Sequence, residues 1–134
     1  MKTTFKIGFA AIIVASTLFS SCGKYDDGPK ISLASKKSRI CRAWTIEKFV
    51  DGATGTETPC TAGCGNIEYL KDGTFKNGGY LVANSKWQFS SDKDKLEIIF
   101  GTTTVSSDNI IRLTSKEFWV KDETSKDERH YKPI

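Results

Sequence analysis

Four cysteines and a single histidine are the side chains of this chain best suited to bind a metal or form a covalent link. Cys60 and Cys64 are separated by three residues, so a disulfide between them would close a small ring and stiffen its loop. The alternative pairing joins Cys41 to one of these two. A structural zinc site needs four nitrogen or sulfur ligands, and the distant His130 completes no typical zinc spacing. We therefore expect a Cys60–Cys64 disulfide and no metal.

His130 is also the only histidine that could act as a catalytic base. A base needs a nucleophile and an orienting group within hydrogen-bond reach. Asp127 and Glu128 lie beside it in the sequence, but neighbours on a strand point to opposite faces. The sequence contains no serine-hydrolase elbow, no zinc-protease motif and no phosphate-binding glycine loop. We expect no catalytic residue, no cofactor and no enzymatic activity.

Residues 1–21 have the composition of a bacterial export signal. Lys2 and Lys6 provide a basic start, and residues 7–19 follow as an apolar run. A helix that crosses a bilayer needs about 20 apolar residues, so this run is too short to span a membrane. It has the length of a signal-peptide core. We therefore expect export to a compartment in which disulfides persist.

Small residues precede the first cysteine, in the order Ser-Ser-Cys22. This resembles the lipobox of bacterial lipoproteins, and the resemblance implies cleavage before Cys22 and attachment of acyl chains such as palmitate to that residue. Two or more acyl chains make membrane anchoring stable. The alternative is an ordinary secretory signal that leaves Cys22 as a plain thiol. The expected organisation is a signal peptide over 1–21, a lipidated tether over 22–30 and one domain over 31–134.

The tether is polar and contains glycine and proline, which indicates an extended segment. Its Lys24-Tyr25-Asp26-Asp27 is similar to the acidic export signal of surface lipoproteins in Bacteroidetes, which implies an outer-membrane anchor with the domain outside. The alternative is a solvated linker.

The formal net charge of +4 falls to +2 once Lys2 and Lys6 leave with the signal. A charge this small shows no electrostatic signature for nucleic acid.

Short alternating apolar runs with turn residues between them predict an all-β domain after a helical turn at 35–41. Phe49 breaks the alternation of the first run, which predicts a bulge or a two-sided position, and Asp72-Gly73 predicts a hairpin. A meander of this length must close to protect its edges. We expect a small antiparallel up-and-down β-barrel of about eight strands, with a β-sandwich as the alternative. The predicted strands are 43–50, 66–70, 74–79, 85–90, 95–100, 102–105 with 110–113, 117–121 and 129–132.

Three of these segments resemble the lipocalin-like lipoproteins of Bacteroidetes. They are Arg42-Ala43-Trp44-Thr45-Ile46, the hairpin at 67–75 and Trp87-Gln88-Phe89. Lipocalins usually carry glycine two places before the first tryptophan, where this chain has Arg42. The family implies a cup for a small apolar or amphipathic ligand. It also implies a basic residue of the last strand over the tryptophan, which would stack Arg129 on Trp44. The alternative is that Arg129 is an exposed charge on a fraying strand.

Two functions follow from this sequence. The first is ligand binding in a hollow barrel lined by apolar side chains, for which the candidates are Trp87, Phe89, Leu96, Ile98 and Phe100. The second is a filled barrel that contacts another envelope protein or a glycan. The apolar residues outside the inward pattern would then form its docking patch, and these are Trp119, Ile99 and Ile110.

Overall fold

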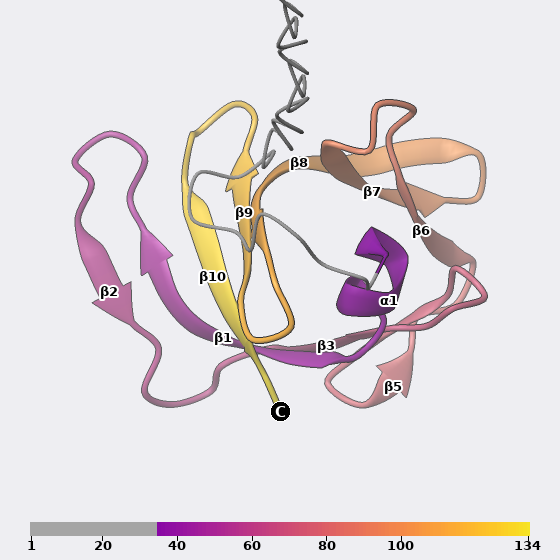
Figure 1. Cartoon of the computed structure of the whole chain (residues 1–134), viewed down its shortest axis with the longest axis horizontal. Coiled ribbons are helices and arrows are strands. Elements are labelled where there is room, and N and C mark those ends of the chain that lie inside the picture. The colour runs from indigo at the N-terminus through magenta and orange to yellow at the C-terminus, as the bar shows by residue number, and fades with distance from the viewer. Residues whose placement is uncertain (1–34) are drawn as a thin grey trace, which may run out of the picture.

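The computed structural model describes residues 35–134, which form one sheet of ten antiparallel strands curled around a core (Figure 1). The predicted signal peptide, Cys22 and the tether lie outside the described residues. No helix in the described part of the chain is long and apolar enough to cross a membrane. The elements are α1 (Lys36–Ile40), β1 (Ala43–Val50), β2 (Glu57–Pro59), β3 (Asn66–Tyr69), β4 (Phe75–Asn77), β5 (Tyr80–Leu81), β6 (Ser85–Phe89), β7 (Lys95–Phe100), β8 (Thr103–Leu113), β9 (Phe118–Asp122) and β10 (Glu128–Pro133).

The strands follow one another as a curled meander in which the first strand, β1, pairs with the last, β10. Their order is β5-β4-β3-β1-β10-β9-β8-β7-β6, with β2 beside β1. The two ends of this order, β5 and β6, are consecutive in the chain, and the Trp87 amide of β6 donates to the Gly73 carbonyl just before β4 at 2.7 Å. The predicted all-β up-and-down barrel is therefore confirmed, with an open seam between β5 and β6. One continuous sheet excludes the sandwich.

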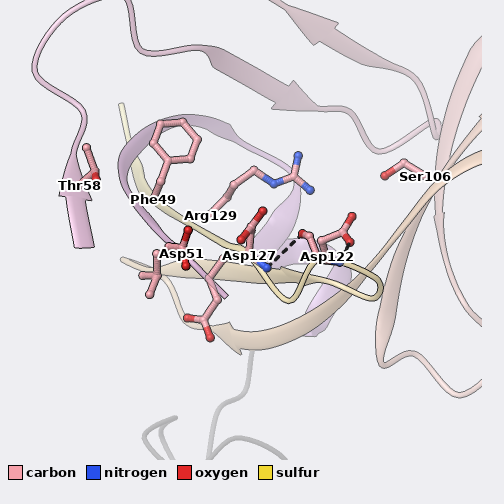
Figure 2. A pocket seen from close by; sticks show the side chains of 10 residues that line it. Phe49, Asp51, Thr58, Ser106, Asp122, Asp127 and Arg129 are labelled. Carbon is pink, nitrogen blue, oxygen red and sulfur yellow. Dashed lines mark hydrogen bonds between the residues drawn. The ribbon is translucent and has the colours of Figure 1, made fainter. Parts of the chain in front are cut away.

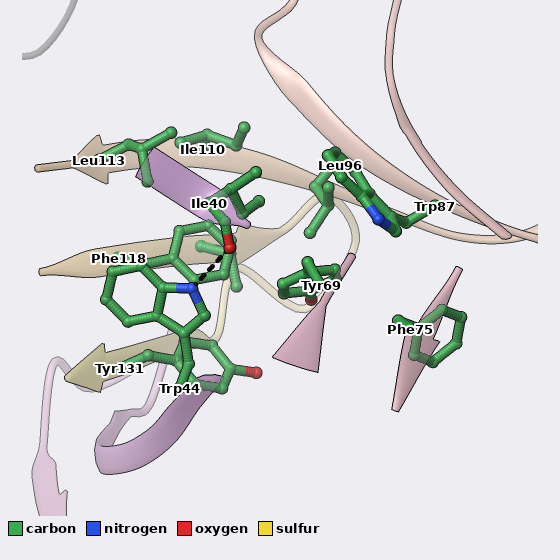
Figure 3. Packing of buried hydrophobic residues seen from close by; sticks show 11 residues of the cluster. Ile40, Trp44, Tyr69, Phe75, Trp87, Leu96, Ile110, Leu113, Phe118 and Tyr131 are labelled. Carbon is green, nitrogen blue, oxygen red and sulfur yellow. Dashed lines mark hydrogen bonds between the residues drawn. The ribbon is translucent and has the colours of Figure 1, made fainter. Parts of the chain in front are cut away.

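Aromatic side chains fill one end of the barrel (Figure 3). Trp44 of β1 and Phe118 of β9 are fully buried, with ring centroids 5.5 Å apart, and Tyr131 of β10 stacks on Phe118 at 5.3 Å. The Trp44 indole Nε1 donates to the Ile40 carbonyl at 2.9 Å, so α1 closes this end of the barrel. We call it the closed end.

The apolar residues predicted to line a cavity mostly fill this core instead. Trp87 and Leu96 are buried members of the core cluster, and Phe89 and Ile98 pack against it. The inward position predicted for Phe100 is wrong, because its side chain is 54% exposed. Phe100 is the last residue of β7, and residues 100–105 around the turn are all exposed, so the β7–β8 hairpin extends beyond the core there.

Two further expectations concern β8 and the cysteines. Ile110 does not belong to an outer patch. It pairs with Val120 of β9, and both side chains are buried in the core.

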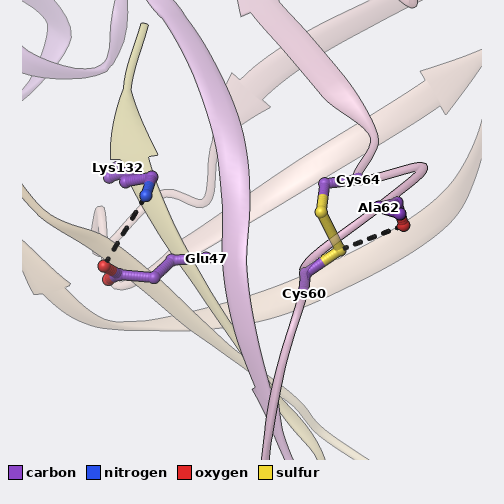
Figure 4. Close-up of a disulfide and its surroundings, with 5 residues drawn as sticks. All are labelled: Glu47, Cys60, Ala62, Cys64 and Lys132. Atoms are coloured by element: carbon purple, nitrogen blue, oxygen red, sulfur yellow. Dashed lines mark hydrogen bonds and ion pairs between the residues drawn. A yellow bond between two sulfur atoms is a disulfide. The ribbon is translucent and has the colours of Figure 1, made fainter.

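Cys60 and Cys64 form a disulfide in the loop between β2 and β3, with their Cα atoms 5.8 Å apart (Figure 4). Cys41 is a free thiol, and burial raises its pKa.

Replacing Phe118 by alanine should destabilise the domain strongly. Its ring contacts Trp44, Tyr69 and Tyr131, and truncating a buried phenylalanine costs about 3–5 kcal/mol in the free energy of unfolding. The measurement is urea unfolding followed by tryptophan fluorescence. Tyr80→Ala is the control, since Tyr80 is 81% exposed, and its effect should stay within about 0.5 kcal/mol. Equal losses for the two variants would contradict the assignment of the core.

Candidate functional site

A pocket of about 540 Å³ is lined in part by Ser106 near the start of β8 (Figure 2). Because Arg39 of α1 binds the Leu113 carbonyl at the end of β8, the pocket lies at the other end of this strand from α1. We call it the mouth pocket. Its walls come from the end of β1, from β2, from the start of β8 and from the turn between β9 and β10. The lining residues are Phe49, Val50, Asp51, Thr58, Ser106, Asp122, Ser125, Asp127, Glu128 and Arg129.

A bulge in β1 turns Phe49 into this pocket. The register of β1 against β10 shifts between Ile46 and Lys48, which confirms the irregularity predicted from Phe49. Past the bulge, Phe49 lies directly opposite Arg129 of β10, and Arg129 lies opposite Val120 of β9. Directly paired residues share one face of a sheet. Since Val120 is buried in the core, Phe49 and Arg129 also belong to the inner face.

An ion pair separates the mouth pocket from the aromatic core. The Arg129 guanidinium Nη2 lies 2.7 Å from Asp108 Oδ1, and the Ser106 hydroxyl donates to Asp108 Oδ2 at 3.1 Å. The Asp108 side chain is 9% exposed and that of Arg129 is 36% exposed. Burial lowers the pKa of Arg129, but Tyr131 and Asp108 outweigh this effect and raise it overall. Arg129 is therefore always charged.

The tyrosines beneath this pair remain neutral. Burial raises the pKa of Tyr69 far above its usual range, and it also raises the pKa of Tyr131. The layer under the mouth pocket thus contains the neutral phenols of Tyr69 and Tyr131. It also contains one ion pair, between the negative Asp108 and the positive Arg129.

Three carboxylates at the rim are held by backbone amides. Asp51 Oδ1 accepts from the Thr54 amide at 2.7 Å, and Asp122 Oδ1 accepts from the Ser125 amide at 2.8 Å. These bonds lower the pKa of both carboxyl groups. Asp127 Oδ1 accepts from the Gly52 amide at 2.8 Å. The rim is therefore negative at neutral pH.

Gly52 allows two turns to pack closely against each other at this rim. A Cβ atom at this position would lie 2.4 Å from the Lys126 carbonyl carbon and 2.5 Å from the Ser125 carbonyl oxygen. No real side chain fits at such distances. The turn after β1 and the turn between β9 and β10 can therefore pack this closely only with glycine at position 52.

The predicted stack of Arg129 on Trp44 is wrong. Trp44 lies opposite Pro133 of β10, four residues further along the strand than Arg129. The register therefore places Arg129 at the mouth and Trp44 at the closed end. The cation over Trp44 is that of Arg42, 5.6 Å from the ring centroid, and Arg42 also donates to the Ser115 carbonyl at 2.6 Å.

The mouth pocket contains none of the five residues predicted to line a cavity. The sequence reasoning missed Phe49, Asp108, Asp122 and Asp127 as site residues. A signal for Asp108 was present, because strand alternation places it on the same face as Ile110. A lone acid on an apolar face is a candidate for an internal ion pair. Nothing in the sequence identified its partner.

Trp119 and His130 form a separate cluster on the outer face of the sheet. Their rings stack at 4.0 Å with an interplanar angle of 4°, and the Arg112 guanidinium lies 4.8 Å from the Trp119 ring centroid. Trp119 is therefore half-buried instead of forming an exposed patch with Ile99. His130 Nε2 lies 2.8 Å from Glu128 Oε2. Among the described residues, no group of three or more histidine, cysteine or acidic side chains is placed to hold a metal ion.

The comparisons with known proteins are sparse. No protein-family model and no curated protein matches this chain. Among solved structures, the chain is similar to a crystal structure of a lipocalin-like protein from Bacteroides uniformis, with 13% sequence identity and a TM-score of 0.45. That similarity covers 72% of this chain and 99% of the other.

Removing Arg129 should leave Asp108 buried without its charge partner. Breaking a fully buried pair costs about 3–5 kcal/mol. Because Arg129 is partly exposed, we expect Arg129→Met to lower the free energy of unfolding by about 1–3 kcal/mol. Adding Asp108→Asn should recover part of this loss, as measured by urea unfolding of both single variants and the double variant. Lys86→Met is the control, at an exposed lysine of β6. Strictly additive losses would contradict the coupling of Arg129 with Asp108.

Proposed function

We propose that this chain is an envelope-anchored lipoprotein whose barrel binds a small amphipathic molecule in the mouth pocket. The observation that carries the proposal is a pocket of about 540 Å³ with the partly exposed Arg129 at its inner end and the 41% exposed Phe49 on its wall. Small-ligand pockets typically have about 300–1,000 Å³ and a few well-placed polar groups. The filled core leaves the mouth as the best candidate for such a site.

The position of α1 is consistent with an anchor at the N-terminus. α1 lies at the closed end, where Arg39 donates to the Leu113 carbonyl and Arg42 to the Ser115 carbonyl. The mouth pocket lies at the other end of the same strand, at Ser106. A lipid on Cys22 would thus connect to the domain at the end away from the mouth, which would leave the pocket accessible.

A filled barrel that contacts another envelope protein or a glycan is the second candidate function. Its support is the exposed apolar surface of the edge strand β5, where Tyr80 is 81% and Leu81 is 60% exposed. The patch predicted around Trp119, Ile99 and Ile110 does not serve this role, because Ile110 is buried.

Ligand binding is tested by an NMR titration of the ¹⁵N-labelled mature chain carrying Cys22→Ser. The added compounds are neutral sugars, octanoate and butylamine, each tested separately. We expect at least one class to shift the backbone amide resonances of Asp51, Ser106 and Ser125, and Phe49→Ala to reduce that shift. If none of the classes shifts these resonances, the barrel is not a binding module of this kind.

Lipidation is tested by metabolic labelling with radioactive palmitate in a bacterial host that processes lipoproteins. We expect the chain to carry label and to sediment with membranes. Cys22→Ser should remove both properties, because the acyl chains are attached to that sulfur and stabilise membrane binding. Cys41→Ser is the matched control and should keep the label. A labelled Cys22→Ser variant would refute the anchor.

A further inference from the structure

We propose that the mouth pocket is a saccharide site that seats a neutral, polyhydroxylated ring. This inference rests on the proposed function, since it names the ligand class of the same pocket. Figure 2 shows the arrangement, with the carboxylates of Asp51, Asp127 and Asp122 in a row beside Phe49 and the Arg129 guanidinium.

The rim carboxylates require a ligand that donates hydrogen bonds. Asp51, Asp122 and Asp127 each use Oδ1 to accept from backbone amides of the turns. Ionised carboxylates accept hydrogen bonds and cannot donate them. Because the pKa values of Asp51 and Asp122 are lowered, these groups stay charged and repel an anionic head group. A fatty acid or a phosphate therefore fits this rim poorly.

Arg129, in contrast, requires a ligand that accepts hydrogen bonds. Its guanidinium has five N–H donors, and Asp108 holds it through Nη2 at 2.7 Å. The guanidinium cannot accept hydrogen bonds, so a ligand that contacts its remaining donors must supply acceptor atoms. An ammonium group donates to the carboxylates but offers Arg129 only repulsion. A hydroxyl group both donates and accepts hydrogen bonds. Several hydroxyl groups on one ring can therefore donate to the rim carboxylates and also accept from Arg129.

Phe49 provides the apolar surface for the ring itself. Its register partners are Thr58 of β2 on one side and Arg129 of β10 on the other. The three side chains therefore form a row on the same face of the sheet. The row runs from the Thr58 hydroxyl through the Phe49 ring to the Arg129 guanidinium. Phe49 is 41% exposed although the phenylalanines of the core are nearly inaccessible. A flat ring that has C–H groups on one face and hydroxyl groups at its edge matches this row.

The mature chain carrying Cys22→Ser is titrated with neutral mono- and disaccharides of glucose, galactose, mannose and N-acetylglucosamine, and separately with octanoate and butylamine. We expect at least one saccharide to shift the amide resonances of Asp51, Ser106 and Ser125. Its affinity should be insensitive to added salt, because screening acts on charged partners. Phe49→Leu, which keeps an apolar side chain but loses the aromatic face, should weaken binding at least about threefold. Phe100→Leu is the matched control, at an exposed phenylalanine outside the pocket, and should bind as the parent does.

The outcomes separate the two proposals. Shifts caused by octanoate or butylamine alone would overturn the saccharide assignment and leave the binding function intact. Saccharide binding that Phe49→Leu does not weaken, or that shifts resonances elsewhere, would also overturn the assignment. If no compound shifts the pocket resonances, both proposals fall. A circular-dichroism melt of Phe49→Leu verifies that any loss of binding does not come from unfolding.

Discussion

The pairing of the first strand with the last is the interaction on which the rest of this structure depends. β1 and β10 run antiparallel from Trp44 opposite Pro133 to Val50 opposite Glu128, and β3 extends the sheet on the other side of β1. This pairing joins the first and last strands of the chain. It also determines which residues of the two strands lie side by side at the same height in the barrel. It also includes one shift of register, between Ile46 and Lys48. That shift keeps Trp44 in the core and turns Phe49 toward the mouth.

The two ends of the barrel have opposite character as a consequence. At the closed end, aromatic rings and α1 exclude water, and the Trp44 indole finds its acceptor in the Ile40 carbonyl. At the mouth, the same inner face carries Asp108 and Arg129, which come from β8 and β10 and meet across β9. A charged pair in this position stabilises the fold less than an apolar pair of similar volume often does. Its presence at the inner end of a pocket, and not inside the core, supports a binding role over a packing role.

The rim depends on turns as much as on strands. Backbone amides after β1 and between β9 and β10 bind the carboxylates of Asp51, Asp122 and Asp127, and Gly52 lets the two turns approach. The Cys60–Cys64 disulfide limits the freedom of the loop that follows β2, the strand that carries Thr58. The mouth is thus built from short segments whose backbones are held by local bonds. A pocket built in this way is preorganised, which would reduce the entropy lost on binding the proposed ligand.

The sequence by itself indicated eight of the ten strands, their meander and the preferred disulfide, because these depend on contacts between residues close along the chain. The short strands β2 and β5 were not predicted. Alternation of apolar side chains, Asp72-Gly73 and the short spacing of Cys60 and Cys64 are local signals. Only the tertiary structure decided which inward residues fill the core and which reach the mouth. The predicted stack of Arg129 on Trp44 was wrong for this reason. The register between β1 and β10 joins residues that are between 78 (Val50 and Glu128) and 89 (Trp44 and Pro133) positions apart, and a bulge shifts it. The ion pair of Asp108 with Arg129 was equally hidden, because it forms across β9 only after the sheet has curled.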